Sequence, residues 1–402
     1  MFINFEYLDA LNTLVVKRKA HTEKEKDVYM AVTLVSEEGG VGEPEFEIDK
    51  EKFVGRCNYN IPNEVKNSIP FSRKLGYTTD PIVAMKQTVR IEPEKVANID
   101  FIISVGYFKE DEKLEAIEIG DGNINYVFKV WNPETGKSLI IKQADTVLRS
   151  SGRPLDMHRN KIEAEILGIE GKLSEGFVPE IYLYDENMYA LSMEDISAYK
   201  NLRTEMAAGK TFPKLADDIA TFMADTLLPT TDLIMNRAEK KEKVKLFTNP
   251  ELCDISEDLV FTEPYYDYKG RNIILDQNMD FVKEKLYGDE DLHAEVGQLR
   301  DDFMNHAQAL IHGDLHSGSI FVNQEGTKVI DPEFAFYGPM GYDIGNVIGN
   351  LFFAWANKYY TDSENTEFLT WIEKTIGEVT DKFKEKFSAK WDALVEFPLY
   401  KT

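Results

Sequence analysis

The chain has 402 residues, of which 43% are hydrophobic, so it is too long and too apolar for a disordered tail and predicts two or three folded domains. Its 46 Lys and Arg residues are outnumbered by 71 Asp and Glu residues, which leaves a net charge of −25. This charge would repel phosphate backbones, so no nucleic-acid partner is expected.

Cysteine usage and hydropathy predict a cytoplasmic protein. Cys57 and Cys253 stand outside any CxxC or Cys/His cluster, which favours a reducing compartment and argues against structural zinc. Residues 1–10 lack the basic and apolar segments of a secretion signal. The most apolar internal stretch, residues 347–356, is too short to cross a bilayer, so no membrane association is expected.

Residues 1–107 are predicted to form a separate, mainly β segment. They contain 14 basic and 17 acidic residues, a balance of −3, whereas the other 295 residues carry −22. Strand-like runs at 28–35, 82–91 and 101–105 are separated by turn residues and predict an antiparallel sheet. No nucleophile, base and orienting group come together here, so the segment is expected to be non-catalytic.

This first segment resembles the β-sandwich part of the glycosyltransferase-36-type sugar phosphorylases. The resemblance is carried by residues 5–20 (FEYLDALNTLVVKRKA), 53–56 (FVGR) and 80–90 (DPIVAMKQTVR). In those enzymes the catalytic carboxylate belongs to a separate helical barrel, and no such barrel follows in this sequence. The resemblance therefore implies a β-sandwich-like fold without chemistry of its own.

A glycine turn opens the next domain, after a charged linker predicted at residues 109–113. Gly120 and Gly122 lie in EIGDGNINYVF (residues 118–128), between an apolar approach and a strand-like exit. Unhindered backbone amides at such a turn can approach phosphate oxygens closely. Alone, the pattern is also that of an ordinary hairpin, so the phosphate interpretation depends on the strand and the helix that come next in the chain.

That strand and that helix supply the next part of the pattern. The strand at residues 139–142 ends with Lys142 on the same face as Ile140, where a buried ammonium needs an anionic partner. Glu163 lies beside the apolar stripe of a helix predicted at residues 159–169. A strand Lys paired with a helix Glu holds nucleotide phosphates in kinases, whereas the alternative for Glu163 is a solvated surface carboxylate.

The second half carries a more specific set of carboxylates. The loop IHGDLHSGSIFV (residues 311–322) contains Asp314, and Asp331 and Glu333 follow at the end of an apolar strand. A hydroxyl that attacks a γ-phosphate needs one carboxylate to orient it and accept its proton. Mg²⁺ needs hard oxygen ligands on a separate element. Asp314 suits the first task, and Asp331 and Glu333 suit the second.

Apolar residues at helical spacing predict a helix before this loop and another helix near the end of the sequence. The first is expected to reach the HGD loop, with apolar positions Leu292, Val296, Leu299, Phe303 and Leu310. The last is expected to use its apolar residues in the core or in a dimer contact, and these are Phe368, Trp371, Ile372, Ile376, Val379, Phe383 and Phe387.

Two other interpretations concern the same loop. His312 and His316 lie four residues apart and would bind zinc if the segment were helical, but Gly313 and Gly318 indicate a loop, and no Glu occupies the HExxH position. We therefore interpret His312 as a structural residue whose ring hydrogen-bonds the backbone and orients the loop. Asp331 has the simpler alternative of a turn residue at a strand end.

Four strings in this region closely resemble the 5-methylthioribose kinases. They are EIGDGNIN (118–125), FTNPELCD (247–254), HGDLHSGSIF (312–321) and VIDPEFAFYGPMGYD (329–343), within a resemblance that covers residues 115–392. The resemblance implies an α+β chain with a protein-kinase-like bilobal fold, with an N-lobe at 115–196 and a C-lobe at 197–402. It also implies ATP-dependent phosphorylation of the 1-hydroxyl of 5-methylthioribose in methionine salvage, usually by a homodimer.

The resemblance also assigns the nucleotide contacts. Residues 188–196 are predicted to form a strand that leads into a connector. From the position of this segment in the chain, its backbone amide and carbonyl groups are predicted to bind the edge of the adenine base. By resemblance, the adenine-binding hinge consists of Glu194, Asp195 and Ile196. Asn125 and Lys142 would contact the ATP phosphates.

The remaining roles follow in the same way. By resemblance, Asp314 would meet the sugar hydroxyl as catalytic base. The nucleotide would also be contacted by Asp331, Pro332 and Glu333, and of these Asp331 and Glu333 would hold Mg²⁺.

The sequence departs from the family at its C-terminal end. Family members continue past the position of Asp392 into helices with an arginine pair that binds the sugar, and this sequence has no counterpart of that pair. Two alternatives to an active methylthioribose kinase are therefore kept. One is a truncated or fused chain that binds nucleotide without turnover, and the other is a kinase for another small sugar or amino alcohol.

Overall fold

The computed structural model of the 402-residue chain describes residues 3–8, 13–18, 28–36, 40–49, 71–73, 75–78, 81–89, 99–104, 107–108, 112–119, 125–144, 159–186 and 188–400. The chain divides into two units, residues 1–113 and 114–402. The glycine turn at Gly120 and Gly122, Cys57 and residues 109–111 of the expected linker lie outside the described residues. Among the described helices, none has the length and apolar character needed to cross a membrane.

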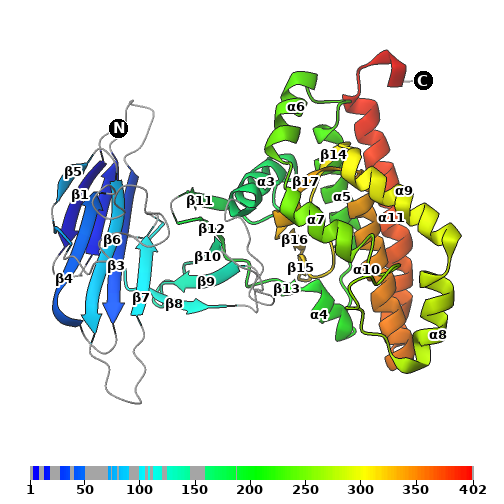
Figure 1. Cartoon of the computed structure of the whole chain (residues 1–402), viewed down its shortest axis with the longest axis horizontal. Helices are drawn as coiled ribbons and strands as arrows, with labels where there is room; N and C mark the ends of the chain where they lie inside the picture. Colours follow the sequence, from blue (N-terminus) through cyan, green and yellow to red (C-terminus); the bar gives the residue numbers. More distant parts are fainter. Residues whose placement is uncertain are drawn as a thin grey trace. The chain divides into compact units, whose positions relative to one another are not determined.

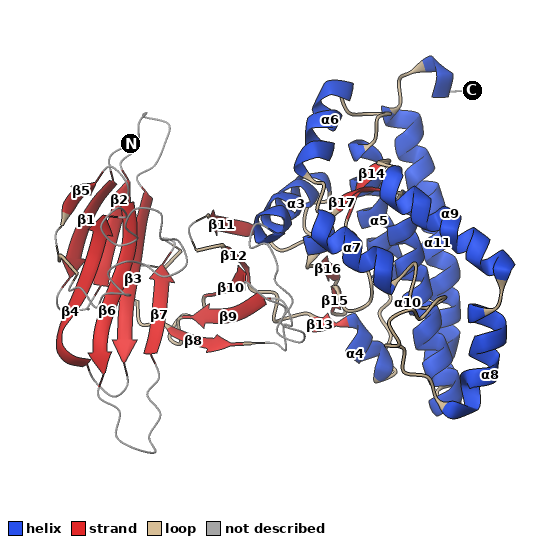
Figure 2. Ribbon diagram, viewed as in Figure 1, coloured by secondary structure: helices blue, strands red, loops and turns tan. Residues whose placement is uncertain are grey.

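The first unit consists of β-strands arranged in two antiparallel sheets (Figure 2). The five-stranded sheet has the order β5-β1-β2-β3-β7, and the second sheet pairs β4 with β6. The strands are β1 (Ile3–Leu8), β2 (Thr13–Arg18), β3 (Val28–Ser36), β4 (Gly40–Asp49), β5 (Gly76–Thr78), β6 (Pro81–Val89) and β7 (Ile99–Ser104). The strand-like runs predicted at 28–35, 82–91 and 101–105 are confirmed as β3, β6 and β7 where the structure describes them, and residues 90, 91 and 105 lie outside the described residues.

Alternating apolar residues explain why these two sheets pack together. Leu14 and Val16 lie two residues apart in β2 and so share one face of the strand. They pack with Phe5 of β1 and with Phe46 and Ile48 of β4, which form a common buried cluster. Since β1 and β2 belong to one sheet and β4 to the other, the core of this unit is the apolar layer between the sheets, as in a β-sandwich.

The second unit begins with a five-stranded antiparallel sheet beside helix α3 (Figure 1). Its order is β11-β12-β10-β9-β8, and α3 packs against β10, β11 and β12. The elements are β8 (Glu115–Glu118), β9 (Asn125–Trp131), β10 (Ser138–Ala144), α3 (Arg159–Leu173), β11 (Ile181–Asp185) and β12 (Ala190–Glu194). Lys142 lies in the central strand β10, opposite Val127 on one side and Leu191 on the other.

The rest of this unit is mainly helical (Figure 2). Its α-helices are α4 (Leu202–Ala207), α5 (Leu215–Leu227), α6 (Arg237–Leu246), α7 (Pro250–Leu259), α8 (Met279–Val282), α9 (Glu290–Asn305), α10 (Met340–Thr361) and α11 (Thr366–Leu394). Short helices of other types are η2 (Leu228–Thr230), η3 (Asp276–Asn278), η4 (Lys283–Tyr287), η5 (Pro332–Phe334) and η6 (Pro398–Tyr400).

Five very short strands support the loops that carry the predicted chemistry. They are β13 (Lys200–Asn201), β14 (Ala309–Ile311), β15 (Ile320–Val322), β16 (Thr327–Val329) and β17 (Phe336–Gly338). β13, β15 and β16 form one small sheet, and β14 pairs with β17 in another. The HGD loop therefore connects two strands of different sheets, and the segment with Asp331 follows β16 directly.

The core of the second unit joins the sheet to the helices. Ile140 of β10 and Leu191 of β12 belong to the same buried cluster as Phe222 of α5 and Ile311 of β14. Phe368 and other residues of α11 complete this cluster. Thus one apolar core fixes the central strand that carries Lys142 relative to the strand that leads into the HGD loop.

The predicted extent of the helix before this loop is wrong. α9 ends at Asn305, and Leu310 lies in β14 instead. His306 has φ −99° and ψ 81°, which is not helical, and the carbonyls of Ala307 and Gln308 accept hydrogen bonds from the Lys240 ammonium. Leu299 was predicted to lie on the apolar face of this helix, but it is exposed. The buried face of α9 is therefore narrower than predicted, with Val296 and Phe303 as its buried residues.

The apolar residues of the last helix are covered. Phe368, Ile372 and Val379 of α11 are fully buried in the core of the second unit. α11 packs along α5 and α10, and Lys382 forms an ion pair with Asp217 of α5 at 2.9 Å. The core alternative is therefore confirmed for Phe368, Ile372 and Val379. Trp371, Ile376 and Phe383 are partly buried against the same core, and the ring of Phe387 contacts that of Phe383.

Candidate active site

Lys142 joins two carboxylates from distant parts of the chain. Its Nζ lies 2.8 Å from Oε1 of Glu163 in α3 and 2.5 Å from Oδ1 of Asp331, the residue before η5. Lys142 and Glu163 are both buried. The predicted pairing of the strand Lys with the helix Glu is present, and the alternative of a solvated Glu163 is wrong.

The electrostatics of this group keep Lys142 and Asp331 charged. Burial lowers the pKa of Lys142, but the carboxylates of Asp331 and Glu163 outweigh this effect and hold the pKa above its ordinary value. Burial raises the pKa of Asp331, but the Lys142 ammonium outweighs it and holds the pKa below its usual range. The site therefore presents a fixed ammonium beside an ionised carboxylate.

Asn125 connects the first strand after the glycine turn to the carboxylate segment. Its Nδ2 donates to Oε2 of Glu333 at 3.1 Å, and its Oδ1 accepts from Nη2 of Arg159 at 2.9 Å. Burial raises the pKa of Glu333, with Lys142 opposing this change and Asp331 adding to it. Arg159, which sequence reasoning missed, thus links α3 to Asn125 from the helix start.

The segment with Asp331, Pro332 and Glu333 has an unusual backbone. Asp331 has φ 63° and ψ 47°, in the left-handed region that Asp and Asn tolerate better than most other residues. Pro332 then begins η5, where its fixed φ and missing N–H suit the first position of a helix. This sharp turn brings Glu333 back toward Asn125 while Asp331 faces Lys142.

Asn249 fixes this segment from the opposite side. Its Nδ2 donates to the carbonyl oxygens of Glu333 at 2.7 Å and Ala335 at 3.1 Å. The residue precedes α7 and lies in FTNPELCD, which sequence reasoning used only as a resemblance. Its contacts explain the physical role of that string, because they hold the backbone on which both carboxylates stand.

His312 supports the HGD loop from within. The ring is buried, and its Nε2 lies 3.0 Å from the carbonyl oxygen of Ile330. Its Nδ1 accepts the backbone N–H of Asp314 at 3.3 Å, so Nε2 carries the proton and donates to Ile330. Burial lowers the pKa of His312 to about 4. The structural interpretation of His312 is therefore confirmed.

Helix α10 anchors the start of the loop through Asp343. The carboxylate of Asp343 accepts the backbone N–H groups of His312 at 2.7 Å and Gly313 at 3.0 Å. Gly313 has φ 78°, and a Cβ there would lie 2.2 Å from the carbonyl oxygen of Phe334, so only glycine fits. Sequence reasoning did not assign a role to Asp343, although it lies in the DPEFAFYGPMGYD string.

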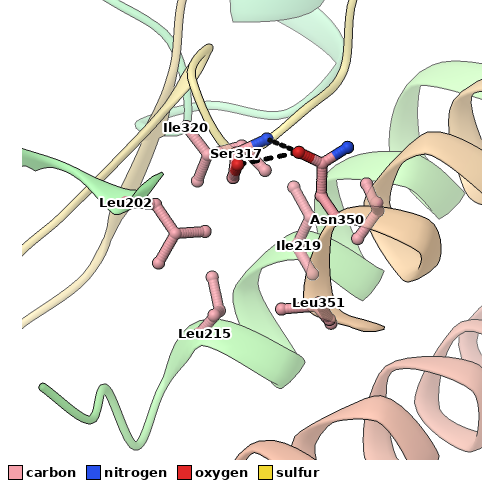
Figure 3. A pocket seen from close by; sticks show the side chains of 8 residues that line it. Leu202, Leu215, Ile219, Ser317, Ile320, Asn350 and Leu351 are labelled. Carbon is pink, nitrogen blue, oxygen red and sulfur yellow. Dashed lines mark hydrogen bonds between the residues drawn. The ribbon is translucent and has the colours of Figure 1, made fainter. Parts of the chain in front are cut away.

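The same helix anchors the end of the loop through Asn350. Its Oδ1 accepts the hydroxyl of Ser317 at 2.8 Å and the backbone N–H of Ser317 at 3.4 Å, above a small apolar hollow (Figure 3). The hollow is lined in part by Leu202, Ile219 and Leu351. Both ends of the loop therefore depend on the one rigid helix α10.

Asp314 lies between these two anchors. Its side chain is partly exposed, and burial raises its pKa above the ordinary value. The charge of Asp331 adds to this effect, whereas His316, Arg203 and Lys142 oppose it. A carboxylate with a raised pKa is a better proton acceptor than an ordinary one, which suits a general base.

The predicted hinge uses its side chains for structure. Oε2 of Glu194 accepts from the Lys328 ammonium at 2.9 Å. The carboxylate of Asp195 pairs with Lys129 at 2.8 Å and accepts from the Ser138 hydroxyl at 2.6 Å. The backbone is partly engaged as well, because the N–H of Glu194 donates to the carbonyl of Glu180 at 2.8 Å and the carbonyl of Ile196 accepts from the N–H of Tyr199 at 2.8 Å. The adenine contact predicted for residues 194–196 therefore stays a prediction about their remaining backbone groups.

Comparisons with known proteins agree with the division of the chain. Residues 115–366 match the model of the phosphotransferase enzyme family, and residues 1–120 match the supersandwich domain of glycosyl hydrolase 94. Ethanolamine kinase from Plasmodium vivax aligns over 68% of this chain and 72% of its own, with 17% identity and a TM-score of 0.36. A TM-score this low carries no weight for the assignment.

Curated relatives are more informative. The chain is 40% identical over 285 residues to methylthioribose kinase from Geobacillus thermodenitrificans (strain NG80-2), covering 70% of this chain and 71% of that protein. It is 41% identical over 288 residues to methylthioribose kinase from Escherichia coli O45:K1, covering 70% and 68%. Both resemblances found in the sequence and the kinase-like α+β fold class are confirmed, and the chain belongs to the methylthioribose kinase family of phosphotransferases.

Proposed function

We propose that this protein transfers the γ-phosphoryl group of ATP to the 1-hydroxyl of 5-methylthioribose. The observation that carries the proposal is the convergence of buried Lys142 in the central strand β10 with buried Glu163 and partly exposed Asp331. The names of the curated relatives supply the substrate. The roles of the individual residues in binding and catalysis are those predicted from the sequence.

The nucleotide is held by charge and by backbone. Lys142, fixed by Glu163, places an ammonium where the phosphates bind, and Asn125 at the start of β9 adds an amide donor. The backbone of residues 194–196 binds the adenine edge. Glu163 therefore acts by fixing the position of the ammonium.

Phosphoryl transfer requires one proton acceptor. Asp314 accepts the proton of the sugar hydroxyl as the hydroxyl oxygen bonds to the γ-phosphorus and the bond from that phosphorus to the bridging oxygen of ADP breaks. The proton moves to Asp314, and the electron pair of the broken bond moves to ADP. The raised pKa of Asp314 makes it suited to this step.

The carboxylates of Asp331 and Glu333 fit a magnesium ion. Both are hard oxygen donors, and burial raises the pKa of Glu333, with Lys142 opposing this change and Asp331 adding to it. Among the residues that the structure describes, no group of three or more His, Cys, Asp or Glu side chains could hold a metal alone. This donor set suits Mg²⁺, which binds through one or two carboxylates together with substrate phosphates and neutralises their charge.

The proposal also covers the domains, the oligomeric state and the location of the protein. We place residues 115–196 and 197–402 as the two kinase lobes and residues 1–107 as a non-catalytic β-sandwich-like segment. We further propose a cytoplasmic homodimer that acts in methionine salvage. The two cysteines, which stand outside any cluster in the sequence, support the location.

A direct assay tests the function. Purified protein is mixed with Mg-ATP and 5-methylthioribose, and ADP release is followed with ribose and choline as comparison acceptors. We expect turnover that depends on 5-methylthioribose and is at least about ten times faster than with either comparison compound. Folded protein that binds ATP by calorimetry but releases no sugar-dependent ADP would support the non-turnover alternative, and preference for ribose or choline would support another acceptor.

A further inference from the structure

His316 lies beside Asp314 and has no role in the function proposed above. Its Nε2 is 3.5 Å from Oδ1 of Asp314. The backbone N–H of His316 donates to the carbonyl of Asp314 at 2.9 Å. Leu315, the residue between them, is fully buried and anchors this part of the loop. The loop therefore turns the side chains of residues 314 and 316 toward each other.

The backbone fixes the protonation pattern of His316. Nδ1 accepts the backbone N–H of Gly318 at 3.0 Å and that of Ser319 at 3.2 Å. A ring nitrogen that accepts a hydrogen bond carries no proton there, so the N–H of the ring is on Nε2, the nitrogen that faces Asp314.

Gly318 allows this ring position. A Cβ at residue 318 would lie 2.6 Å from Cε1 of His316, too close for any side chain to coexist with the ring where it is. The same Cβ would lie 2.9 Å from Nη2 of Arg203 in α4. The imidazole and the guanidinium thus both approach the bare backbone at residue 318, next to the carboxylate of Asp314.

We propose that His316 is a positioning residue for the catalytic base, whose Nε2–H group donates to Oδ1 of Asp314 and leaves Oδ2 to the acceptor hydroxyl. The inference rests on the proposed function of Asp314. The distance of 3.5 Å is long for a hydrogen bond, and catalytic hydrogen bonds of this kind often shorten when substrate binds. A carboxylate held through one oxygen presents the other in a single direction, which lowers the cost of aligning the hydroxyl.

Other charged groups also face Asp314, and none of them replaces this contact. Arg203 approaches from α4, Lys142 from β10 and Asp331 from the segment after β16. No hydrogen bond to the carboxylate of Asp314 from Arg203 or Lys142 is present in the described structure. His316 is the group whose N–H direction is set by the loop itself.

Two substitutions of His316 distinguish the role of Nδ1 in the turn from the role of Nε2 toward Asp314. His316→Asn keeps an acceptor near the position of Nδ1 and so preserves the turn, but it removes the donor to Asp314. His316→Gln places an amide donor near the position of Nε2 but removes the acceptor. His306→Asn, at an exposed position after α9, controls for the loss of an imidazole elsewhere.

The positioning role predicts how the kcat values of these variants rank. His316→Asn should lower kcat about 10- to 100-fold and leave the KM for ATP within about twofold, because only the base loses its partner. His316→Gln should retain more of kcat than His316→Asn, and His306→Asn should match the unaltered protein. Unchanged kcat in His316→Asn, or a lower kcat in His316→Gln than in His316→Asn, would show that the ring serves only as a turn cap.

A second measurement does not depend on turnover. The N–H donor stabilises the ionised carboxylate, so His316→Asn should raise the pKa of Asp314, which carbon NMR can follow in protein with labelled Asp carboxyl groups. The signal is assigned by its loss in Asp314→Asn. If the unaltered protein transfers no phosphate, the proposed function fails, yet this titration still decides the contact, and an unchanged pKa in His316→Asn would refute it.

Discussion

The Lys142 ammonium is shared by carboxylates from two elements that are far apart in the sequence. Burying a lone charge is costly, and both partners are needed to offset that cost. Lys142 could be found from the sequence because a charged residue on the buried face of a strand has few explanations, and Asp331 because it follows an apolar strand after the HGD loop. For Glu163 the sequence left a solvated surface carboxylate open as the alternative. Arg159, Asn249 and Asp343 could not be found from the sequence, because each acts on backbone or amide groups that only the folded chain brings near.

Asp314 provides the most direct test of chemistry at a single residue. Asp314→Asn keeps the shape of the side chain but removes its ability to accept a proton, so we expect kcat to fall about 100-fold or more. ATP affinity should stay the same, because Asp314 acts on the acceptor. Calorimetry and the ADP assay measure the two quantities, with the exposed Asp381→Asn as control. Full turnover in Asp314→Asn would exclude it as the base.

His312 predicts how stability depends on pH. Its folded-state pKa of about 4 lies below the unfolded value of about 6.5, so between these values the unfolded chain binds a proton that the folded chain does not. This contribution is therefore complete above pH 6.5 and is lost as pH falls toward 4. Between about pH 7.5 and 5.5 it should amount to about 1.3 kcal/mol.

The matched variant for this prediction is His312→Gln, whose amide can still donate to the carbonyl of Ile330. Urea unfolding at about pH 7.5 and 5.5, both above the isoelectric point of 4.7, compares the two proteins. The unaltered protein should lose more stability than His312→Gln over this interval. Equal losses in the two proteins would show that His312 does not titrate as described.

The sequence predicted the type and place of β10, α3 and α9, but it misplaced one element boundary. β10 and α3 have clear buried faces, and both were predicted close to their observed positions. The end of α9 was wrong because Leu310 continues the helical spacing by chance, although the chain has already entered β14. The carbonyls that bind Lys240 decide this boundary, and such a tertiary contact leaves no local pattern.

At the level of helices, α11 should contribute strongly to stability. Ile372 is fully buried between α11 and the core, so Ile372→Ala should cost about 2–5 kcal/mol in the free energy of unfolding. Ile376, one turn later, is only partly buried and should cost clearly less when changed to Ala. Urea unfolding followed by circular dichroism measures both. Equal costs would contradict the described packing of α11.

At the level of the whole molecule, each unit has its own apolar core. The first centres on Phe5 and Phe46, and the second joins the sheet to the helices. A unit with its own core can fold alone. We therefore expect residues 114–402, expressed separately, to bind ATP with the affinity of the full chain within about twofold and to keep its kcat.

The tryptophans make this prediction easy to check, because all four lie in the second unit, at positions 131, 355, 371 and 391. Their fluorescence reports unfolding of that unit only. The midpoint of urea unfolding by fluorescence should be the same with and without residues 1–113. A shift to lower urea in the shorter chain would show that the first unit stabilises the second.

The left-handed backbone at Asp331 decides which variant can reveal what its charge does. Alanine in that conformation costs about 1–2 kcal/mol in steric strain, so an alanine variant would weaken nucleotide binding by distorting the turn as well as by removing the carboxylate. Asparagine accepts the same dihedral angles and is uncharged. Any loss measured in Asp331→Asn can then be attributed to the missing negative charge, and the difference between the two variants gives the energy of the turn itself.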